Sequence, residues 1–177
     1  MISNKKDKVV LRAIEYNDLK LIQRWRNMPS IQPFVREYRE MNMENIEKWY
    51  NSIINHKEFI FFIIEDLERK PIGVTGLTYI DWVNKHADLH LGLYEKSWGD
   101  TEYGTATMKI MLDYGFNFIN LNKIYAEIYS IDTNKLQLFE GNSFKRDAVL
   151  REHYYHKGKY EDSHVLSILK SEYQNNF

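Results

Sequence analysis

An aspartate and a histidine stand two positions apart in a stretch with the period of a strand. Every second residue of 87–94 is apolar, so Asp88 and His90 share the opposite, polar face. A carboxylate in this place can take a proton from a substrate, and the imidazole can orient or replace it. The alternatives are an exposed strand carboxylate, which can pair with Arg12 or Lys85, and a half-buried polar histidine.

A predicted helix start follows this strand and can bind an anion. Downstream of Gly104, apolar residues recur at steps of three and four as far as Ile119, which is typical of one face of a helix. The unpaired N–H groups and the dipole of a helix N-terminus favour an anion, phosphate above all. The alternative is a strand-to-helix turn that binds no ligand.

The elements that must position these groups are predicted from hydrophobic periodicity. Strands are predicted at Val9–Ile14, Phe59–Ile64, Pro71–Tyr79, from Ala87, at 124–129, after Phe144 and at His164–Leu169; helices are predicted after Asn17 or Asp18, at 45–54, from Gly104 and around Leu136. Antiparallel hairpins followed by strand, helix and strand indicate an α+β domain with a mixed sheet. No repeat or linker interrupts the chain, so one domain over residues 1–177 is expected, with a frayed C-terminal tail.

Composition excludes several functions. A net charge of -1 gives no electrostatic argument for nucleic acid or an anionic membrane, and without Cys there is neither a disulfide nor a thiolate metal site. The start lacks a signal peptide and the longest apolar run, Phe59–Ile64, is too short to span a bilayer, so a cytoplasmic protein is expected. Aromatic residues make up 15% of the chain, which suggests an aromatic cleft or a homodimer interface, or else only coding bias.

Several strings follow one another in a telling order: ADLHLGL, YGTATMKIMLDYGF, NLNKIYAEIY, LFEGNSF and REHYYHKGKYED. Together they resemble the GNAT N-acetyltransferases, in particular the RimJ/RimL branch and its polyamine and amino-sugar relatives, over nearly the whole chain. The resemblance implies the GNAT fold, with a central, mostly antiparallel mixed sheet flanked by helices. It also implies that acetyl-CoA is the cosubstrate and that an amine accepts the acetyl group.

The resemblance places acetyl-CoA along the central strand and the helix after it. Backbone N–H groups near Leu91, Gly92 and Leu93 would bind the thioester carbonyl or the pantetheine arm. The loop and first helical turn would wrap the pyrophosphate. This segment comprises Gly99, Asp100, Thr101, Glu102, Tyr103, Gly104 and Thr105.

The pyrophosphate segment departs from the family pattern. Relatives usually carry Gln or Arg, then Gly three positions on, then Gly or Ala two further. Gly104 fits the last position, whereas Glu102 and Gly99 occupy the other two, and WGDTEYG is one residue longer than the usual string. A carboxylate about 5 Å from a phosphate charge would cost roughly 3 kcal/mol at an effective dielectric of about 20. Asp100 and Glu102 are therefore expected to point outward.

The resemblance also assigns the proton transfers. An amine with a pKa near 10 arrives protonated, so it needs a base. Asp88 is the predicted base because many relatives carry Glu there, and His90 is its partner. Many relatives use the Tyr of a Leu-Tyr-Glu string as general acid, but this chain has Phe139 in that place. The thiolate then leaves unaided, or Tyr154 or Tyr155 donates the proton, or catalysis is impaired.

Two further residues are predicted to contact the cosubstrate. Asp132 stands where relatives often have an Asn that contacts it, and Lys135 follows three residues later. The alternatives are that Asp132 caps the helix starting at Thr133 and that Lys135 is a solvated surface lysine.

The acceptor site is expected in the front third of the chain. Trp25, Arg26 and Asn27 spell WRN, a string shared with relatives that act on nucleotide-linked amino sugars. Arg26 could contact a phosphate, although pairing with a nearby carboxylate is an alternative.

Two aromatic residues and three carboxylates are weaker candidates for the acceptor site. Trp49 and Tyr50 could stack on a ligand, although their helical spacing favours core packing. Glu37, Glu40 and Glu44 would suit a polyamine or form a solvated face.

The sequence therefore predicts an acetyl-CoA-dependent N-acetyltransferase that acts by direct attack of a small primary amine, without a metal. The acceptor classes are amino sugars, nucleotide amino sugars and polyamines. A protein N-terminus and a non-catalytic acyl-CoA-binding module remain alternatives.

Overall fold

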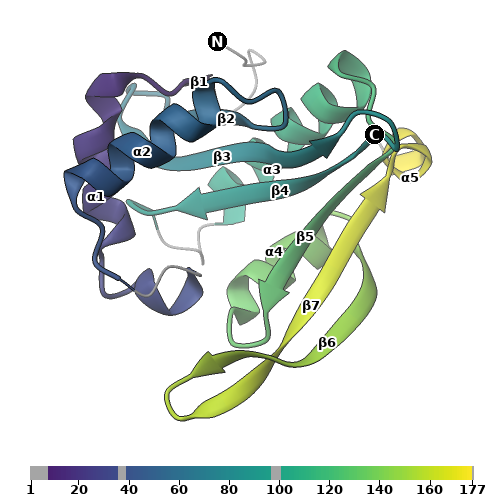
Figure 1. Cartoon of the computed structure of the whole chain (residues 1–177). Helices are drawn as coiled ribbons and strands as arrows, with labels where there is room; N and C mark the ends of the chain where they lie inside the picture. The colour runs from purple at the N-terminus through teal and green to yellow at the C-terminus, as the bar shows by residue number, and fades with distance from the viewer. Residues whose placement is uncertain (1–7, 36–38, 97–100, 177) are drawn as a thin grey trace.

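The computed structural model describes residues 8–35, 39–96 and 101–176, and a seven-stranded sheet carries helices on both faces (Figure 1). The strands are β1 (Val9–Ala13), β2 (Ile60–Asp66), β3 (Pro71–Asp81), β4 (His86–Leu93), β5 (Lys123–Tyr129), β6 (Lys145–His156) and β7 (Lys159–Leu169). The α-helices are α1 (Leu19–Arg26), α2 (Met43–Ile54), α3 (Thr101–Asp113), α4 (Thr133–Gly141) and α5 (Lys170–Asn176). Short helical segments are η1 (Tyr16–Asp18), η2 (Gln32–Phe34) and the π-helical η3 (Tyr114–Phe118).

The strand order is β1-β2-β3-β4-β5-β7-β6, and β4 with β5 is the parallel pair of an otherwise antiparallel sheet. This confirms the predicted α+β fold. A parallel pair needs a crossover connection, which α3 and η3 provide. Since α3 follows β4 and α4 follows β5, both helices begin beyond the carboxyl ends of the two parallel strands.

The sheet separates two hydrophobic cores. The apolar face of β4 packs with α3, η3 and α4 in a core that includes Ala87, Leu89, Leu91, Leu93, Met108, Met111, Phe116 and Phe139. The opposite face packs under α1 and α2, in a core of Leu19, Ile22, Trp25, Ile46, Ile63 and Val74. The alternation predicted for residues 87–94 is therefore confirmed. Strand β2 is covered on both faces, as its uninterrupted apolar run predicted.

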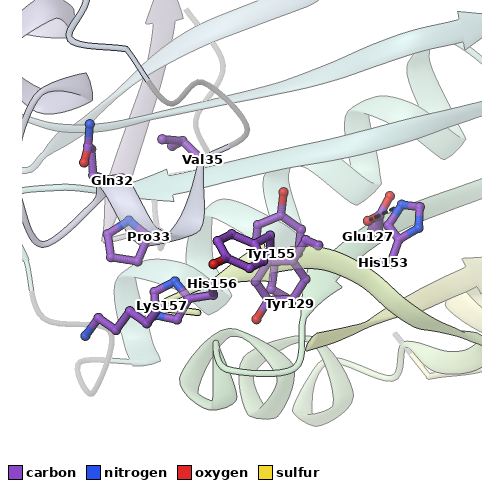
Figure 2. Close-up of a pocket in the computed structure, with 10 residues that line it drawn as sticks. Gln32, Pro33, Val35, Glu127, Tyr129, His153, Tyr155, His156 and Lys157 are labelled. Carbon is purple, nitrogen blue, oxygen red and sulfur yellow. Dashed lines mark ion pairs between the residues drawn. The ribbon is translucent and has the colours of Figure 1, made fainter. Parts of the chain in front are cut away.

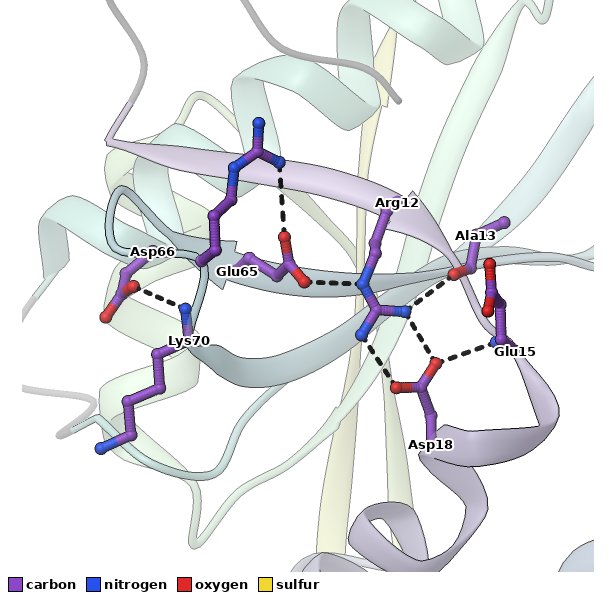
Figure 3. Close-up of polar contacts among 8 residues, drawn as sticks. Arg12, Ala13, Glu15, Asp18, Glu65, Asp66 and Lys70 are labelled. Atoms are coloured by element: carbon purple, nitrogen blue, oxygen red, sulfur yellow. Dashed lines mark hydrogen bonds and ion pairs between the residues drawn. The ribbon is translucent and has the colours of Figure 1, made fainter.

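An arginine ties the edge strand β1 to η1 and β2 (Figure 3). The Arg12 guanidinium donates to both carboxylate oxygens of Asp18 at 2.7 and 2.8 Å, and its Nε donates to Glu65 at 2.6 Å. Burial alone would raise the pKa of Asp18, but the hydrogen bonds from Arg12 and from the Glu15 backbone outweigh it and lower that pKa. Arg12 is thus engaged at the sheet edge, away from its possible partner Asp88.

The C-terminal part differs from the prediction. The two strands predicted after Phe144 and at His164–Leu169 are longer than expected and form the β6–β7 hairpin, and α5 stands in place of the predicted frayed tail. The hairpin turns at Lys157 and Gly158, both with positive φ, which suits a tight hairpin turn. Helix α5 is held by Glu172, whose carboxylate accepts from the Leu169 N–H at 2.9 Å. Helix α3 also begins earlier than predicted, at Thr101. Across the described ranges, no helix is both long and apolar enough to span a membrane.

Candidate active site

The parallel strands β4 and β5 pair over a short distance and then part (Figure 1). The pairs are His86 with Lys123, Ala87 with Ile124 and Asp88 with Tyr125. Beyond Asp88, β4 continues along β3 to Leu93, whereas the described residues of β5 offer it no further pairing. Backbone groups that β4 turns toward β5 are therefore open to a ligand there, as predicted for the stretch Leu91, Gly92 and Leu93.

A cavity of about 420 Å³ lies where the two strands part. Its lining comes from α1, η2 and α2, from β2, β3, β4 and β5, and from the start of α4. The lining residues that matter below are Arg26, Trp49, Phe61, Tyr79, Asp88, His90, Glu127, Tyr129, Asp132 and Lys135. The polar face of β4 thus opens into this cavity, and the aromatic residues line a cleft.

Burial, with a smaller contribution from nearby positive charges, keeps the His90 imidazole neutral. Burial lowers the pKa of His90 to about 3, and the positive charges of Lys135 and Arg26 lower it further in the same direction. An imidazole with so low a pKa is a poor base for an ammonium group. The structure therefore favours Asp88 over His90 for proton removal, and His90 can only assist as a neutral group.

Asp132 and Lys135 belong to the first turn of α4. The Asp132 carboxylate accepts from the Lys135 N–H at 3.2 Å, which confirms the predicted helix cap. Burial raises the pKa of Asp132, and Lys135 opposes this effect. Burial lowers the pKa of Lys135, and the carboxylates of Asp132 and Asp88 oppose it. Lys135 is therefore a cavity residue, and its interpretation as a solvated surface lysine is wrong.

The first turn of α3 supplies the predicted pyrophosphate segment in part. Glu102 forms an ion pair with Lys8 and is about half exposed, so it points outward as predicted. Thr101 is exposed, whereas Tyr103 packs against the core below α3. Gly104 is buried, and an added Cβ would lie 2.6 Å from Leu138 Cδ2, so this glycine allows α3 to approach α4.

The rest of the segment adds one contact. Thr105 accepts a hydrogen bond from Asn142 at 3.2 Å. Gly99 and Asp100 lie outside the described residues.

A second pocket, of about 610 Å³, adjoins the cavity and shares Val35, Glu127 and Tyr129 with it (Figure 2). In this pocket His153 lies 3.4 Å from the Glu127 carboxylate. Tyr155 is 65% exposed and belongs to this pocket; within the described residues it is not part of the lining around Asp88. Tyr155 as the donor of a proton to the leaving thiolate stays a prediction, and the structure places this residue in the adjoining pocket. Tyr154 stacks on Tyr129 with the ring centroids 3.9 Å apart.

The residues of the WRN string do not all lie at the cavity. Arg26 lines the cavity, and its role as an acceptor contact stays a prediction. Trp25 is fully buried, stacks on Tyr94 and donates from Nε1 to Glu95 at 2.7 Å, so its assignment to the acceptor site is wrong. Asn27 is also assigned wrongly, because its amide hydrogen-bonds both the N–H and the C=O of Met41.

The weaker candidates for the acceptor site also lie in different places. Trp49 lines the cavity and contacts Phe61 edge to face, with centroids 5.6 Å apart, whereas Tyr50 packs on Tyr16. Glu44 pairs with Lys48 on an exposed surface, and Glu40 is exposed. Glu37 lies outside the described residues.

Sequence reasoning missed two cavity residues on β5. Glu127 and Tyr129 lie on the polar face of the alternating stretch 124–129, so the signal was present. It could not be used, because the sequence does not reveal that β5 borders the polar face of β4. Among the described residues no cluster of three or more His, Asp or Glu could hold a metal ion.

The site is thus a cleft at the point where two central parallel strands part, with a carboxylate beside it and a helix after each strand. Residues 8–145 match the family model of the Acetyltransferase (GNAT) domain, so the chain belongs to the GNAT family and is an N-acetyltransferase, as the resemblance predicted.

The relatives include polyamine acetyltransferases. Spermidine N(1)-acetyltransferase of Vibrio cholerae is 27% identical over 167 residues, which cover 94% of this chain and 96% of that protein. A crystal structure of that species' spermidine N-acetyltransferase with CoA and spermine has a TM-score of 0.86 and 26% identity, covering 95% of this chain and 99% of that one. A dodecameric structure of the same enzyme in an intermediate state has a TM-score of 0.82 and 25% identity, covering 95% and 97%.

Proposed function

We propose that this chain transfers the acetyl group of acetyl-CoA to a primary amine of a small molecule by direct attack, without a covalent enzyme intermediate. One observation carries the proposal. Asp88, the last residue of β4 that pairs with β5, lies where the strands part and lines the cavity. The open edge of β4 suits the thioester arm, and the N-terminus of α3 suits the pyrophosphate.

Asp88 acts as the base. An amine in the cavity gives its proton to the Asp88 carboxylate, directly or through water, and the neutral nitrogen then attacks the thioester carbon. The walls formed by α2, β4 and β5 hold the amine and the thioester in one orientation, which replaces a bimolecular encounter by a positioned one. The imidazole of His90 is neutral, so it adds no positive charge beside the reacting amine.

A polyamine is the first acceptor class. Its support comes from the spermidine-acetylating relatives and from the lining, where Asp88, Glu127 and Asp132 supply carboxylates for ammonium groups. Trp49 and Phe61 present aromatic surface, which also attracts cations.

A phosphate-bearing amino sugar is the second acceptor class. It is favoured by Arg26 in the cavity and by His156 and Lys157 in the adjoining pocket, since these side chains suit an anion at the far end of a longer acceptor.

Thermal unfolding with and without acetyl-CoA, followed by thiol release, tests the function. Acetyl-CoA at 100 times its Kd adds about 2.7 kcal/mol, a shift of several degrees. Thiol release is measured with spermidine, amino sugars, nucleotide amino sugars and N-terminal peptides. Release with a small amine is the expected result. Stabilisation without release from any amine would support a non-catalytic acyl-CoA-binding module and contradict the proposal, and release with peptides alone would move the acceptor to protein N-termini.

We also propose that the chain self-associates. The support is the dodecameric structure of the Vibrio cholerae relative and the exposed aromatic residues Tyr155 and Tyr160 on the β6–β7 hairpin. An elution volume at monomer mass over a wide concentration range would contradict self-association.

A further inference from the structure

Lys135 occupies a particular place in the cavity. It lies in the first turn of α4, directly after the parallel strand β5, and its N–H is fixed by the Asp132 cap. Its Nζ lies 6.0 Å from the centre of the Phe139 ring, one helical turn further along α4. Lys135 and Asp88 line the same cavity from its two sides, one on α4 and one on β4.

The proposed reaction needs a proton donor as well as a base. When the carbon–sulfur bond of acetyl-CoA breaks, the sulfur leaves as a thiolate, and its conjugate thiol has a pKa near 8.5. Donation to the sulfur by a group of similar pKa favours that step. Phe139 has no proton to give and is fully buried.

Most other groups of the lining suit this task badly. Arg26 carries a guanidinium, a group that donates hydrogen bonds but does not serve as a proton donor in catalysis. His90 is neutral, and its pKa of about 3 leaves no imidazolium to act as an acid. Tyr79 is 61% exposed at the end of β3, and the Tyr129 ring is stacked on Tyr154 toward the adjoining pocket. Among the basic side chains that line the cavity in the described part of the chain, Lys135 is the one left to give a proton.

The surroundings of Lys135 match the task. Burial lowers the pKa of Lys135 below its usual value. The carboxylates of Asp132 on the loop before α4 and of Asp88 on β4 oppose this shift by favouring the ammonium form. Arg26 from α1 and neutral His90 from β4 line the same cavity, as do Glu127 and Tyr129 from β5.

We propose that Lys135 is a catalytic residue whose ammonium group gives a proton to the CoA sulfur as the carbon–sulfur bond breaks. This inference rests on the proposed function. The acceptor ammonium loses two protons in forming the amide, and Asp88 takes them in turn. One returns from Asp88 to Lys135 and replaces the proton given to sulfur, and the other goes to solvent, so the products are the amide, CoA thiol and one proton.

Three variants at this position test the proposal. Lys135→Met removes charge and proton, Lys135→Arg keeps a charge that does not dissociate, and Lys135→Ala leaves space for trimethylammonium, which can give a proton but cannot form an amide. Lys20→Met, at an exposed lysine of α1, is the control. We expect kcat to fall 100- to 1,000-fold in all three variants, with acetyl-CoA still raising the Tm as in the wild type.

Two further measurements should respond only if Lys135 donates a proton. The wild-type rate should fall at alkaline pH as Lys135 loses its proton, and Lys135→Arg should lack this limb. Trimethylammonium should restore part of the rate of Lys135→Ala and leave Lys135→Met unchanged.

Near wild-type kcat in Lys135→Arg would overturn the proposal, since charge alone would then suffice. Loss of the Tm shift by acetyl-CoA in all three variants would overturn it too, because Lys135 would then serve binding. If the wild type released no thiol with any amine, the proposed function itself would fail, which is a different result.

Discussion

Gly73 on β3 lies against the backbone of Gly92 on β4 so closely that an added Cβ would stand 2.2 Å from the Gly92 oxygen. A backbone oxygen held in a central sheet cannot move aside as a side chain can. We expect Gly73→Ala to lower the free energy of unfolding by at least about 2 kcal/mol, measured by urea denaturation. Gly141→Ala, where a Cβ would meet nothing within 4 Å, is the control and should change stability by less than about 1 kcal/mol. Equal stabilities of the two variants would contradict this reading of the β3–β4 contact.

Removing the carboxylate of Asp88 should stop acetyl transfer and leave the binding of acetyl-CoA intact. We expect Asp88→Asn to lower kcat by about 100- to 10,000-fold, because the acceptor then keeps its proton. The Tm shift produced by acetyl-CoA should persist. Glu44→Gln, at an exposed carboxylate that pairs with Lys48, should have wild-type kcat. An Asp88→Asn enzyme within threefold of the wild type would exclude Asp88 as the base.

Trp49 should bind the acceptor without taking part in the chemistry. It lines the cavity next to Phe61, so Trp49→Leu should raise the acceptor KM about tenfold and leave kcat nearly unchanged. The neighbouring Tyr50→Leu, which loses packing against Tyr16 instead, should keep the wild-type KM. A larger rise in KM for Tyr50→Leu than for Trp49→Leu would refute the assignment.

His90 should make the fold sensitive to moderate acid. Its pKa of about 3 lies below the unfolded value of about 6.5, so the unfolded chain binds the extra proton between these values and stability falls as the pH drops through them. Lowering the pH from 7 to 5 should cost the wild type about 2 kcal/mol more than His90→Gln in urea denaturation. His56→Gln, at an exposed histidine, should follow the wild type. Parallel losses in the wild type and His90→Gln would show that His90 is not the source.

Arg12 should be essential to the sheet edge. Its removal leaves the largely buried carboxylate of Asp18 without its cation and leaves Glu65 with only the 3.5 Å contact to Arg69, so Arg12→Met should destabilise the protein by about 3–5 kcal/mol. Lys48→Met breaks only an exposed pair with Glu44 and should cost less than about 0.5 kcal/mol. Urea denaturation of both variants at pH 7 makes the comparison, and a loss of under 1 kcal/mol for Arg12→Met would contradict it.

The central strands could be predicted because the burial of their faces determines the spacing of their apolar residues. Residues 87–94 alternate since one face packs on α3, and β2 is uniformly apolar since both of its faces are covered. Strand β6 has no such period, because nearly all of its residues are exposed. Helix α5 is short and begins at the end of β7 with a local cap from Glu172, so its sequence resembled a tail.

A residue of the candidate site could be predicted only where its role follows from the face of the strand on which it lies. Asp88 followed from the alternation and from the family resemblance, whereas Trp25 and Asn27 were assigned from a string that does not reveal which side of α1 meets the cavity. Glu127 and Lys135 depend on how β4 and β5 part, which is a property of the pairing of two distant segments.

Strand β6 forms one end of the sheet, and its irregularity has a consequence for how copies of this protein can meet. Its register with β7 shifts at Arg146–Ala148 and again at Leu150–Tyr154, and Glu152 between these positions has a φ of 50°. A bulged strand with charged side chains is a poor template for another strand. This end of the sheet is therefore protected against growth by edge-to-edge addition, the route to fibrous aggregates.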